Sequence, residues 1–337
     1  MTRKARMDSS NVDREPGHNL EASAQLETAV LFLVFNRPES TARVFQAIRK
    51  AKPAQLYVAA DGPRSNRSDE ARHCAEVRRI ATAVDWPCEV RTLFRETNLG
   101  CRRAVSRAIE WFFEHVEEGI ILEDDCVPDP SFFQFTQELL ALYRDDNRVM
   151  VISGDHFHGA AHQPPYSYFF SRYNHCWGWA SWRRAWKSYD RDMSLWPALR
   201  NSEWLLGVGD GCRLFQRYWT EMFDRAYEGE VDSWAYRWTF SCWAQNGLTI
   251  LPARNLVTNI GFGVDATHTK STSGAESSLK LETMDFPLVH PIGMVRDVAA
   301  DLWTDRHVLG ISRWTSLKNS VRKIPGVHVL ARILRAN

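Results

Sequence analysis

The sequence predicts an α/β fold in which helices flank a mostly parallel sheet. Short apolar runs alternate with segments of helical period along the first half of the 337 residues, as βαβ units require. The runs are continuous, as in the segment "AVLFLVF" at 29–35, which is typical of strands covered on both faces. Polar residues follow the ends of these runs, where a parallel sheet gathers its ligand-binding groups.

The elements follow in order along the chain. Strands are expected at 29–35, 56–61, 88–94, 119–123 and 148–154. Helices are expected from about Glu39, over 69–84, over 102–116, and from Asp129-Pro130 to about Arg144, where proline suits a first turn. From Tyr166 onward the pattern changes to aromatic strands, helices over about 179–189, 212–228 and 232–246, and short strands over 248–252 and 256–260.

The chain is expected to form one compact body with tails. Residues 1–27 are polar and lack the apolar core of a secretory signal, so they are interpreted as a disordered leader. Residues 28–155 form a first half, 156–270 a second half of the same domain, and 271–337 an extension. Residues 311–337 hold six Lys and Arg and no acid. They are interpreted as a solvated helix pair, or alternatively as a basic amphipathic segment that contacts an anionic membrane surface.

Composition excludes several classes of function. A formal net charge of +1 provides no field that would draw the chain to nucleic acid. Seven scattered cysteines without a CxxC pair argue against a zinc knuckle or a disulfide framework and favour a reducing, cytoplasmic setting. No P-loop motif occurs. The segment "GFGVDA" at 261–266 matches a dinucleotide fingerprint in letters, but no helix pattern follows it.

Five expected strands end in polar residues. They are followed by Asn36-Arg37, Asp61-Gly62, Asn98-Leu99-Gly100, Glu123-Asp124-Asp125 and Ser153-Gly154-Asp155-His156. One polar strand end is ordinary, whereas five in register predict a single ligand along the edge of the sheet.

The triplet Glu123-Asp124-Asp125 places three like charges together after a buried-looking strand. Such carboxylates repel each other and are costly to desolvate, so a cation is expected beside them. Carboxylate oxygens suit Mn²⁺ or Mg²⁺, which would also supply a counter-charge for a diphosphate. On an extended segment Glu123 and Asp125 share one side and Asp124 faces the other. The alternative interpretation is one helix-capping acid and two solvated ones.

Tryptophan is unusually abundant in the second half. Of 14 tryptophans, ten lie between Trp177 and Trp243. Most are expected in the core, but a few would line a cleft, where flat aromatic faces suit sugar rings. Trp177, Trp179 and Trp234 are the candidates, with His156 as a loop residue near the acceptor.

The strand, "LEDD", the short turn and "PSFFQF" resemble the nucleotide-sugar transferases of the GT-A fold. The resemblance is to N-acetylglucosaminyltransferases that initiate complex N-glycans and to similar bacterial family 2-like proteins. It covers roughly 30–263, is strongest over 119–136 and is fair over 176–190 and 231–240. It implies a metal-dependent, inverting transfer of a sugar from a UDP-linked donor to a hydroxyl of a carbohydrate or glycolipid acceptor.

The resemblance also implies roles for residues of the donor site. Asp125 would bind the metal, and Asp124 and Glu123 would hold the ribose, the sugar or metal-bound water. Arg37 and Asp61 would frame the nucleobase beside Asn36. Residues expected on the phosphates or the metal are Arg102, Arg103 and His268.

For the catalytic base, the resemblance indicates Asp232 in "EVDSWAYRW", with Asp155 as the rival. Asp232 could instead cap the helix expected at 233–246. Two other classes stay open: a sugar nucleotidyltransferase or phosphohydrolase on a related fold, and a non-catalytic nucleotide-sugar-binding protein at a membrane surface. The relatives' membrane anchor and luminal cysteines have no counterpart in the sequence given.

Overall fold

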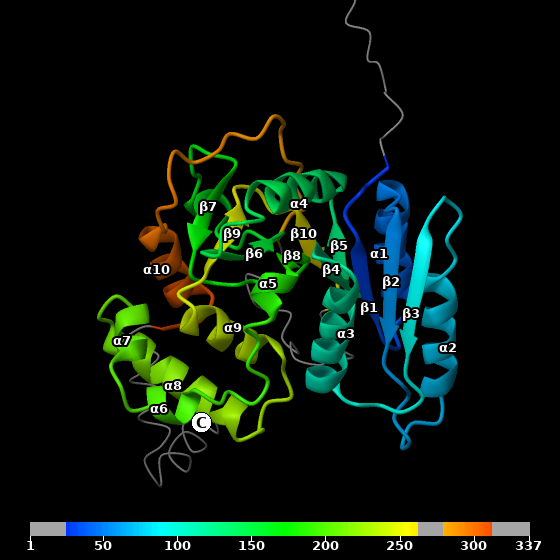
Figure 1. The fold of residues 1–337 in the computed structure, drawn as a ribbon, viewed down its shortest axis with the longest axis horizontal. Helices are drawn as coiled ribbons and strands as arrows, with labels where there is room; N and C mark the ends of the chain where they lie inside the picture. Colours follow the sequence, from blue (N-terminus) through cyan, green and yellow to red (C-terminus); the bar gives the residue numbers. More distant parts are fainter. Residues whose placement is uncertain (1–24, 262–278, 312–337) are drawn as a thin grey trace, which may run out of the picture.

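A computed structural model describes residues 25–261 and 279–311 and contains one large mixed sheet (Figure 1). Its strand order is β3 (Glu89–Phe94), β2 (Gln55–Ala60), β1 (Val30–Val34), β4 (Glu118–Glu123), β8 (Trp179–Trp182), β6 (Val149–Ser153), β9 (Leu248–Pro252) and β7 (Tyr168–Ser171). The pairs β1–β2, β2–β3, β1–β4 and β6–β9 are parallel, whereas β8 and β7 run antiparallel to their neighbours. The predicted α/β fold with a mostly parallel sheet is therefore confirmed.

Two hydrophobic cores cover the two faces of the sheet. The first contains α1 (Pro38–Ala51), α2 (Glu70–Ala81) and α4 (Pro130–Leu142). The second contains α3 (Cys101–His115), α5 (Arg183–Trp186), α6 (Trp196–Leu199), α7 (Trp204–Val208), α8 (Arg213–Tyr227) and α9 (Ala235–Ala244). In β1, Phe32 points into the first core and Leu31 into the second, which explains why this strand is an unbroken apolar run.

The helix expected over 179–189 is wrong in its first part. Residues Trp179–Trp182 form β8, and only Arg183–Trp186 is helical. Trp179 packs into the second core, whereas Ala180 and Trp182 pack into the first, so the side chains alternate with a period of two. Because the strand is buried on both faces, its sequence lacks the polar alternation that would have separated it from a buried helix.

A second correction concerns the short turn expected between "LEDD" and "PSFFQF". Residues Cys126–Pro128 form β5, which pairs antiparallel with β10 (Val257–Asn259). Asp129 then caps α4, because its side chain accepts a hydrogen bond from the Ser131 backbone N–H at 2.9 Å. This small sheet connects the residues after the acidic triplet to a segment 130 positions later in the chain.

The two expected halves share one sheet, since β8 lies between β4 and β6. The described part of the expected leader also belongs to the body, because Leu26 is buried in the first core. A short 3₁₀ turn (Gly159–Ala161) follows β6. None of the helices in residues 25–261 and 279–311 is both long and apolar enough to cross a bilayer.

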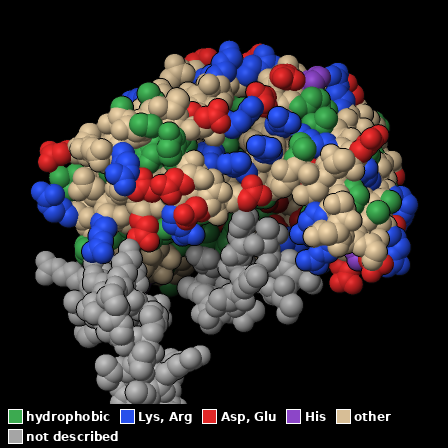
Figure 2. Space-filling view, turned by 90° about the horizontal axis from the view of Figure 1, so that it is seen from below, with side chains coloured by type: hydrophobic (Ala, Val, Ile, Leu, Met, Phe, Trp, Pro, Cys, Tyr) green, Lys and Arg blue, Asp and Glu red, His purple; other side chains and the backbone are tan. Residues whose placement is uncertain are grey.

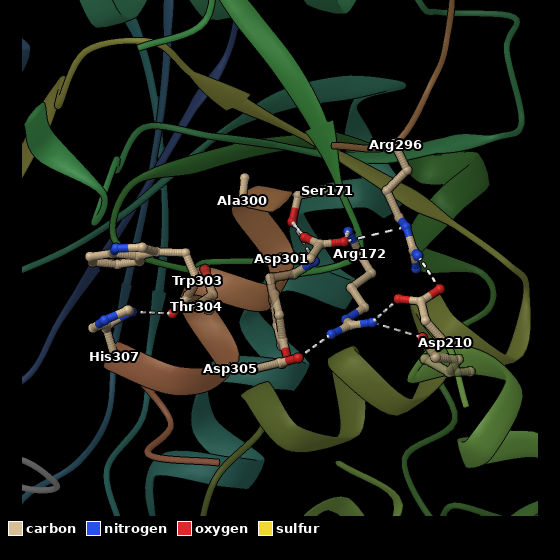
Figure 3. Close-up of polar contacts among 12 residues, drawn as sticks. Ser171, Arg172, Asp210, Arg296, Ala300, Asp301, Trp303, Thr304, Asp305 and His307 are labelled. Carbon is tan, nitrogen blue, oxygen red and sulfur yellow. Dashed lines mark hydrogen bonds and ion pairs between the residues drawn. The ribbon is translucent and has the colours of Figure 1, made fainter. Parts of the chain in front are cut away.

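The described residues of the expected extension, 279–311, also pack on this body. Met284 and Leu288 are buried in the first core. Figure 3 shows α10 (Val298–His307) held by a network of charged side chains centred on Arg172. The Arg172 guanidinium contacts Asp305 at 2.6 Å and Asp210 at 3.0 Å, and Asp301 accepts a hydrogen bond from the Ser171 hydroxyl at 2.5 Å.

Candidate active site at the carboxyl ends of β1 and β4

The strand order reverses between β1 and β4. From β1 the chain proceeds through α1 to β2 and β3 on one side, then returns through α3 to β4 on the other side. In open α/β sheets such a switch point creates the ligand-binding crevice at the carboxyl ends of the strands. Leu33 pairs with Glu123 across the two strands, so the residues that follow β1 and β4 are neighbours.

Figure 2 views the molecule from the side toward which β1, β2 and β3 point in Figure 1. Acidic and basic side chains are interspersed across this face, without one large patch of either sign.

Glu123 ends β4, whereas Asp124 and Asp125 form a turn and lie at the same Arg37 guanidinium, which corrects the alternation expected of an extended segment. Asp124 is 7% exposed, and its Oδ2 accepts a hydrogen bond from the Phe35 backbone N–H at 3.2 Å. Glu123 and Asp125 are half-buried, and the Trp234 side chain hydrogen-bonds to Glu123. Burial, followed by the charge of Asp125, raises the pKa of both Glu123 and Asp124 well above the ordinary carboxyl range.

Arg37 supplies part of the positive charge that the triplet requires. Its Nη1 lies 2.9 Å from Asp125 Oδ2 and 3.5 Å from Asp124 Oδ1. The guanidinium therefore faces the carboxylates; the nucleobase contact predicted for it stays a prediction. The carboxyl pKa values of Glu123 and Asp124 remain raised despite this contact, mainly because both groups are buried.

Asp125 is the carboxylate best placed to hold a cation. Across residues 25–261 and 279–311, no three His, Cys, Asp or Glu side chains form a ready-made metal site. Mg²⁺-type cations, however, are often bound through one or two carboxylates together with phosphate oxygens and water. Asp125 is half-buried, and a Cβ on Gly261 would lie 2.1 Å from its Oδ2, so glycine permits the close approach of that backbone. An Mn²⁺ or Mg²⁺ ion at Asp125 stays a prediction, and His268 lies outside the described residues.

Asp61 fixes the loop that precedes α3. Its carboxylate accepts hydrogen bonds from the backbone N–H groups of Leu99 at 3.0 Å and Gly62 at 3.0 Å. It is 8% exposed, and burial raises its pKa. The structure therefore places the predicted nucleobase residue against backbone, where it sets the position of the α3 N-terminus.

Asp232 lies at the N-terminus of α3. Its Oδ1 accepts a hydrogen bond from the Arg102 backbone N–H at 3.3 Å, and Arg102 Nε lies 3.9 Å away. Gly100 precedes the helix with φ 79°, and a Cβ there would lie 2.8 Å from the Asp232 carboxylate. Asp232 therefore caps α3, which corrects the expectation that it caps α9, whose cap position is Trp234.

Asp232 is also close to the acidic triplet and open to solvent. Trp234, two residues further on, hydrogen-bonds to Glu123. Burial and the negative charges of Glu123 and Asp232 raise the pKa of the Cys101 thiol on the first turn of α3. The Asp232 side chain is 56% exposed, so an incoming hydroxyl group can reach it. Arg103 is exposed on the same helical turn.

Asp155 is placed very differently and is not suited to act as the base. It has no exposed surface, its Oδ2 accepts a hydrogen bond from the Trp177 backbone N–H at 3.2 Å, and its Oδ1 lies 3.5 Å from His175 Nδ1. Burial lowers the pKa of His175 to about 3, so this imidazole is neutral. Asp155 anchors the segment between β7 and β8 and is out of reach of an acceptor.

The side chains predicted to contact the acceptor are also divided between buried and accessible positions. Trp179 and Trp234 are 1% and 3% exposed and stack on each other at 5.5 Å. His156 is 2% exposed and packs on Phe169. These three side chains are core residues, which corrects their predicted contact with the acceptor.

Trp177 is half-buried, as the prediction requires, and Phe157 packs edge-on against it at 5.0 Å. Phe157 also contacts His175, at 4.4 Å between ring centroids. Sequence reasoning missed Phe157, although its position between two histidines after β6 was a signal that could have found it.

Comparison with known proteins adds little to this geometry. No family model matches the chain, and no curated protein matches it. Among solved structures, the crystal structure of HddC from Yersinia pseudotuberculosis is similar over 47% of this chain and 77% of that chain, with 8% identity and a TM-score of 0.28. A likeness of this size carries no argument about activity.

Proposed function

We propose that the chain is a metal-dependent glycosyltransferase of the GT-A type, which moves a sugar from a UDP-linked donor to a hydroxyl of a carbohydrate or glycolipid acceptor. One observation carries the proposal. An acidic triplet that contacts Arg37 lies at the switch point of the sheet, and a solvent-accessible carboxylate, Asp232, lies at the N-terminus of α3. Nucleotide ligands bind at such switch points, and proton transfer from an acceptor hydroxyl requires an accessible carboxylate.

The donor would lie along the carboxyl ends of β1 and β4. The helix dipole at the N-terminus of α3 favours a negatively charged diphosphate, and Arg102 and Arg103 add positive charge on the same turn. Asp125 would hold the cation, which, when bound, stabilises the negative charge of the departing diphosphate. Arg37 adds one positive charge beside Asp125 and Asp124.

The acceptor would approach from the side of Asp232. The Arg102 backbone N–H holds one carboxylate oxygen of Asp232, which leaves the other to accept the proton of the acceptor hydroxyl. The deprotonating oxygen attacks the anomeric carbon opposite the diphosphate, and the configuration at that carbon inverts. Trp177 and Phe157 offer aromatic surface for a sugar ring near this position.

The test is a transfer assay with the full chain. The protein is incubated with Mn²⁺, UDP-, GDP-, dTDP- and CDP-linked sugars and a panel of simple glycosides. Mass spectrometry follows the transferred sugar, and NMR reads the anomeric configuration. We expect Mn²⁺-dependent consumption of one donor class with inversion, abolished by Asp125→Asn. If no nucleotide sugar is consumed, with or without an acceptor, the proposal is wrong.

A further inference from the structure

A second polar cluster lies on the β2 side of the same strand ends. Asn36 follows β1, and its Nδ2 donates a hydrogen bond to Glu70 Oε1 at 2.8 Å. Glu70 is 4% exposed at the start of α2. Its Oε2 also accepts a hydrogen bond from the Arg64 backbone N–H at 2.7 Å, and the Arg64 guanidinium pairs with the carboxylate. A buried carboxylate paired with an exposed guanidinium therefore holds the Asn36 side chain.

This contact fixes which way the Asn36 amide faces. The hydrogen bond from Arg64 lowers the pKa of Glu70, so the carboxylate is ionised at neutral pH. An ionised carboxylate can only accept hydrogen bonds, so Asn36 must present its NH₂ group to Glu70. The carbonyl oxygen at the other end of the amide is then available as an acceptor, and no residue in 25–261 or 279–311 is seen to donate to it.

The position of Asn36 suits the base of a bound nucleotide. Its neighbours on either side, Phe35 and Arg37, contact Asp124 and Asp125. Asn36 itself turns to the opposite side, toward α2. The Arg64 guanidinium lies 5.4 Å from the centroid of the Phe35 ring, so two flat groups that can stack on a heterocycle lie at the same place.

We propose that Asn36, oriented by Glu70, selects a nucleobase whose ring nitrogen carries a hydrogen, and therefore uracil over cytosine. Uracil N3–H can donate to the Asn36 carbonyl oxygen, whereas cytosine N3 is itself an acceptor and would face that oxygen without a proton between them. Polar sites of this kind discriminate strongly, because the wrong ligand leaves a polar group unpaired. Glu70 is a positioning residue in this scheme. The inference rests on the proposed function and adds the basis of its nucleotide specificity.

Calorimetry of the full chain with Mn²⁺ and UDP, CDP or N3-methyl-UDP tests the inference. We expect UDP to bind about tenfold more tightly than the other two, equivalent to about 1.4 kcal/mol. N3-methyl-UDP isolates the contribution of the N3 hydrogen, because it keeps both carbonyl groups of uracil. Equal binding of all three ligands would overturn this inference alone. Binding of none of them would contradict the proposed function as well.

Glu70→Gln tests the positioning role. A glutamine side chain can accept or donate, so the Asn36 amide is no longer held in one orientation. The UDP-to-CDP affinity ratio should fall toward one while binding persists. Glu76→Gln on the same helix is the matched control, since Glu76 is exposed and pairs with Arg79, and it should keep the wild-type ratio. If Glu70→Gln does not fold, Asn36→Ala should weaken UDP binding and spare CDP binding. A wild-type ratio in either folded variant would overturn the inference.

Discussion

Replacing Asp232 by asparagine should separate catalysis from folding. The change removes the charge and the basicity of the side chain. It keeps a side-chain oxygen that can accept the hydrogen bond from the Arg102 backbone N–H, which is 3.3 Å long in the wild-type chain. Because this side chain is 56% exposed, the loss of a charged helix cap should cost below about 1 kcal/mol of the free energy of unfolding. The loss of a general base should lower the transfer rate by about 10²- to 10⁴-fold.

Asp155→Asn should give the opposite pattern. Asp155 has no exposed surface and accepts a hydrogen bond from the Trp177 backbone N–H at 3.2 Å. Its other oxygen lies 3.5 Å from His175 Nδ1. An amide in this place puts an NH₂ group among buried partners arranged for a carboxylate, which should cost about 1–3 kcal/mol of the free energy of unfolding. Transfer by the folded fraction should stay close to the wild-type rate.

Two assays on both variants distinguish Asp232 from Asp155 as the catalytic base. Urea unfolding measures the free energy of unfolding, and sugar transfer at saturating donor measures the rate constant, with UDP binding as the check that the donor site is intact. Low transfer in folded Asp155→Asn combined with wild-type transfer in Asp232→Asn would refute the assignment of the base. An equal decrease in the free energy of unfolding in the two variants would contradict the difference in burial between Asp232 and Asp155.

Three further results are expected. Burial raises the folded-state pKa of Glu123 and Asp124, so their protonated forms contribute stability that is lost as pH rises from about 4 toward 8. The melting temperature of the nucleotide-free chain should therefore fall over this pH range, and binding of Mn²⁺ and UDP should offset the fall. Arg172→Met leaves Asp305, which is 5% exposed, without its counter-charge, and should lower the free energy of unfolding in urea by about 3–5 kcal/mol. Trp177→Ala removes half-buried aromatic surface and should raise the KM for the acceptor about tenfold, with UDP affinity unchanged in calorimetry.

The first half of the fold could be predicted because its signals are local. Each parallel strand is an apolar run, and each helix carries a buried face at helical spacing, as in α1 with Val44, Phe45 and Ile48. β8 could not be separated from a helix in this way, because a strand buried on both faces presents no alternation of polar and apolar residues. The short pairing of β5 with β10 depends on residues about 130 positions apart and leaves no local signal.

The site was predictable to the extent that strand ends define it. The place of Glu123, Asp124 and Asp125 after a buried strand followed from the sequence, whereas their alternation did not, because Asp124 and Asp125 form a turn. The contact between Asp232 and the start of α3 joins positions 130 residues apart, so its capping role could not be read from the sequence. Burial was the other missing quantity: Asp155 resembles other polar strand ends in the sequence, yet the segment between β7 and β8 covers it completely.

Calorimetric titration of UDP into the full chain, with and without Mn²⁺, tests the central claim most directly. We expect Mn²⁺ to raise the affinity for UDP by about tenfold or more, and Asp125→Asn to remove that increase. Asp85→Asn, a change at an exposed carboxylate of the N-terminal half, should leave it intact. An affinity for UDP that is independent of Mn²⁺, or an Mn²⁺ effect that survives Asp125→Asn, would contradict a donor site built on this carboxylate.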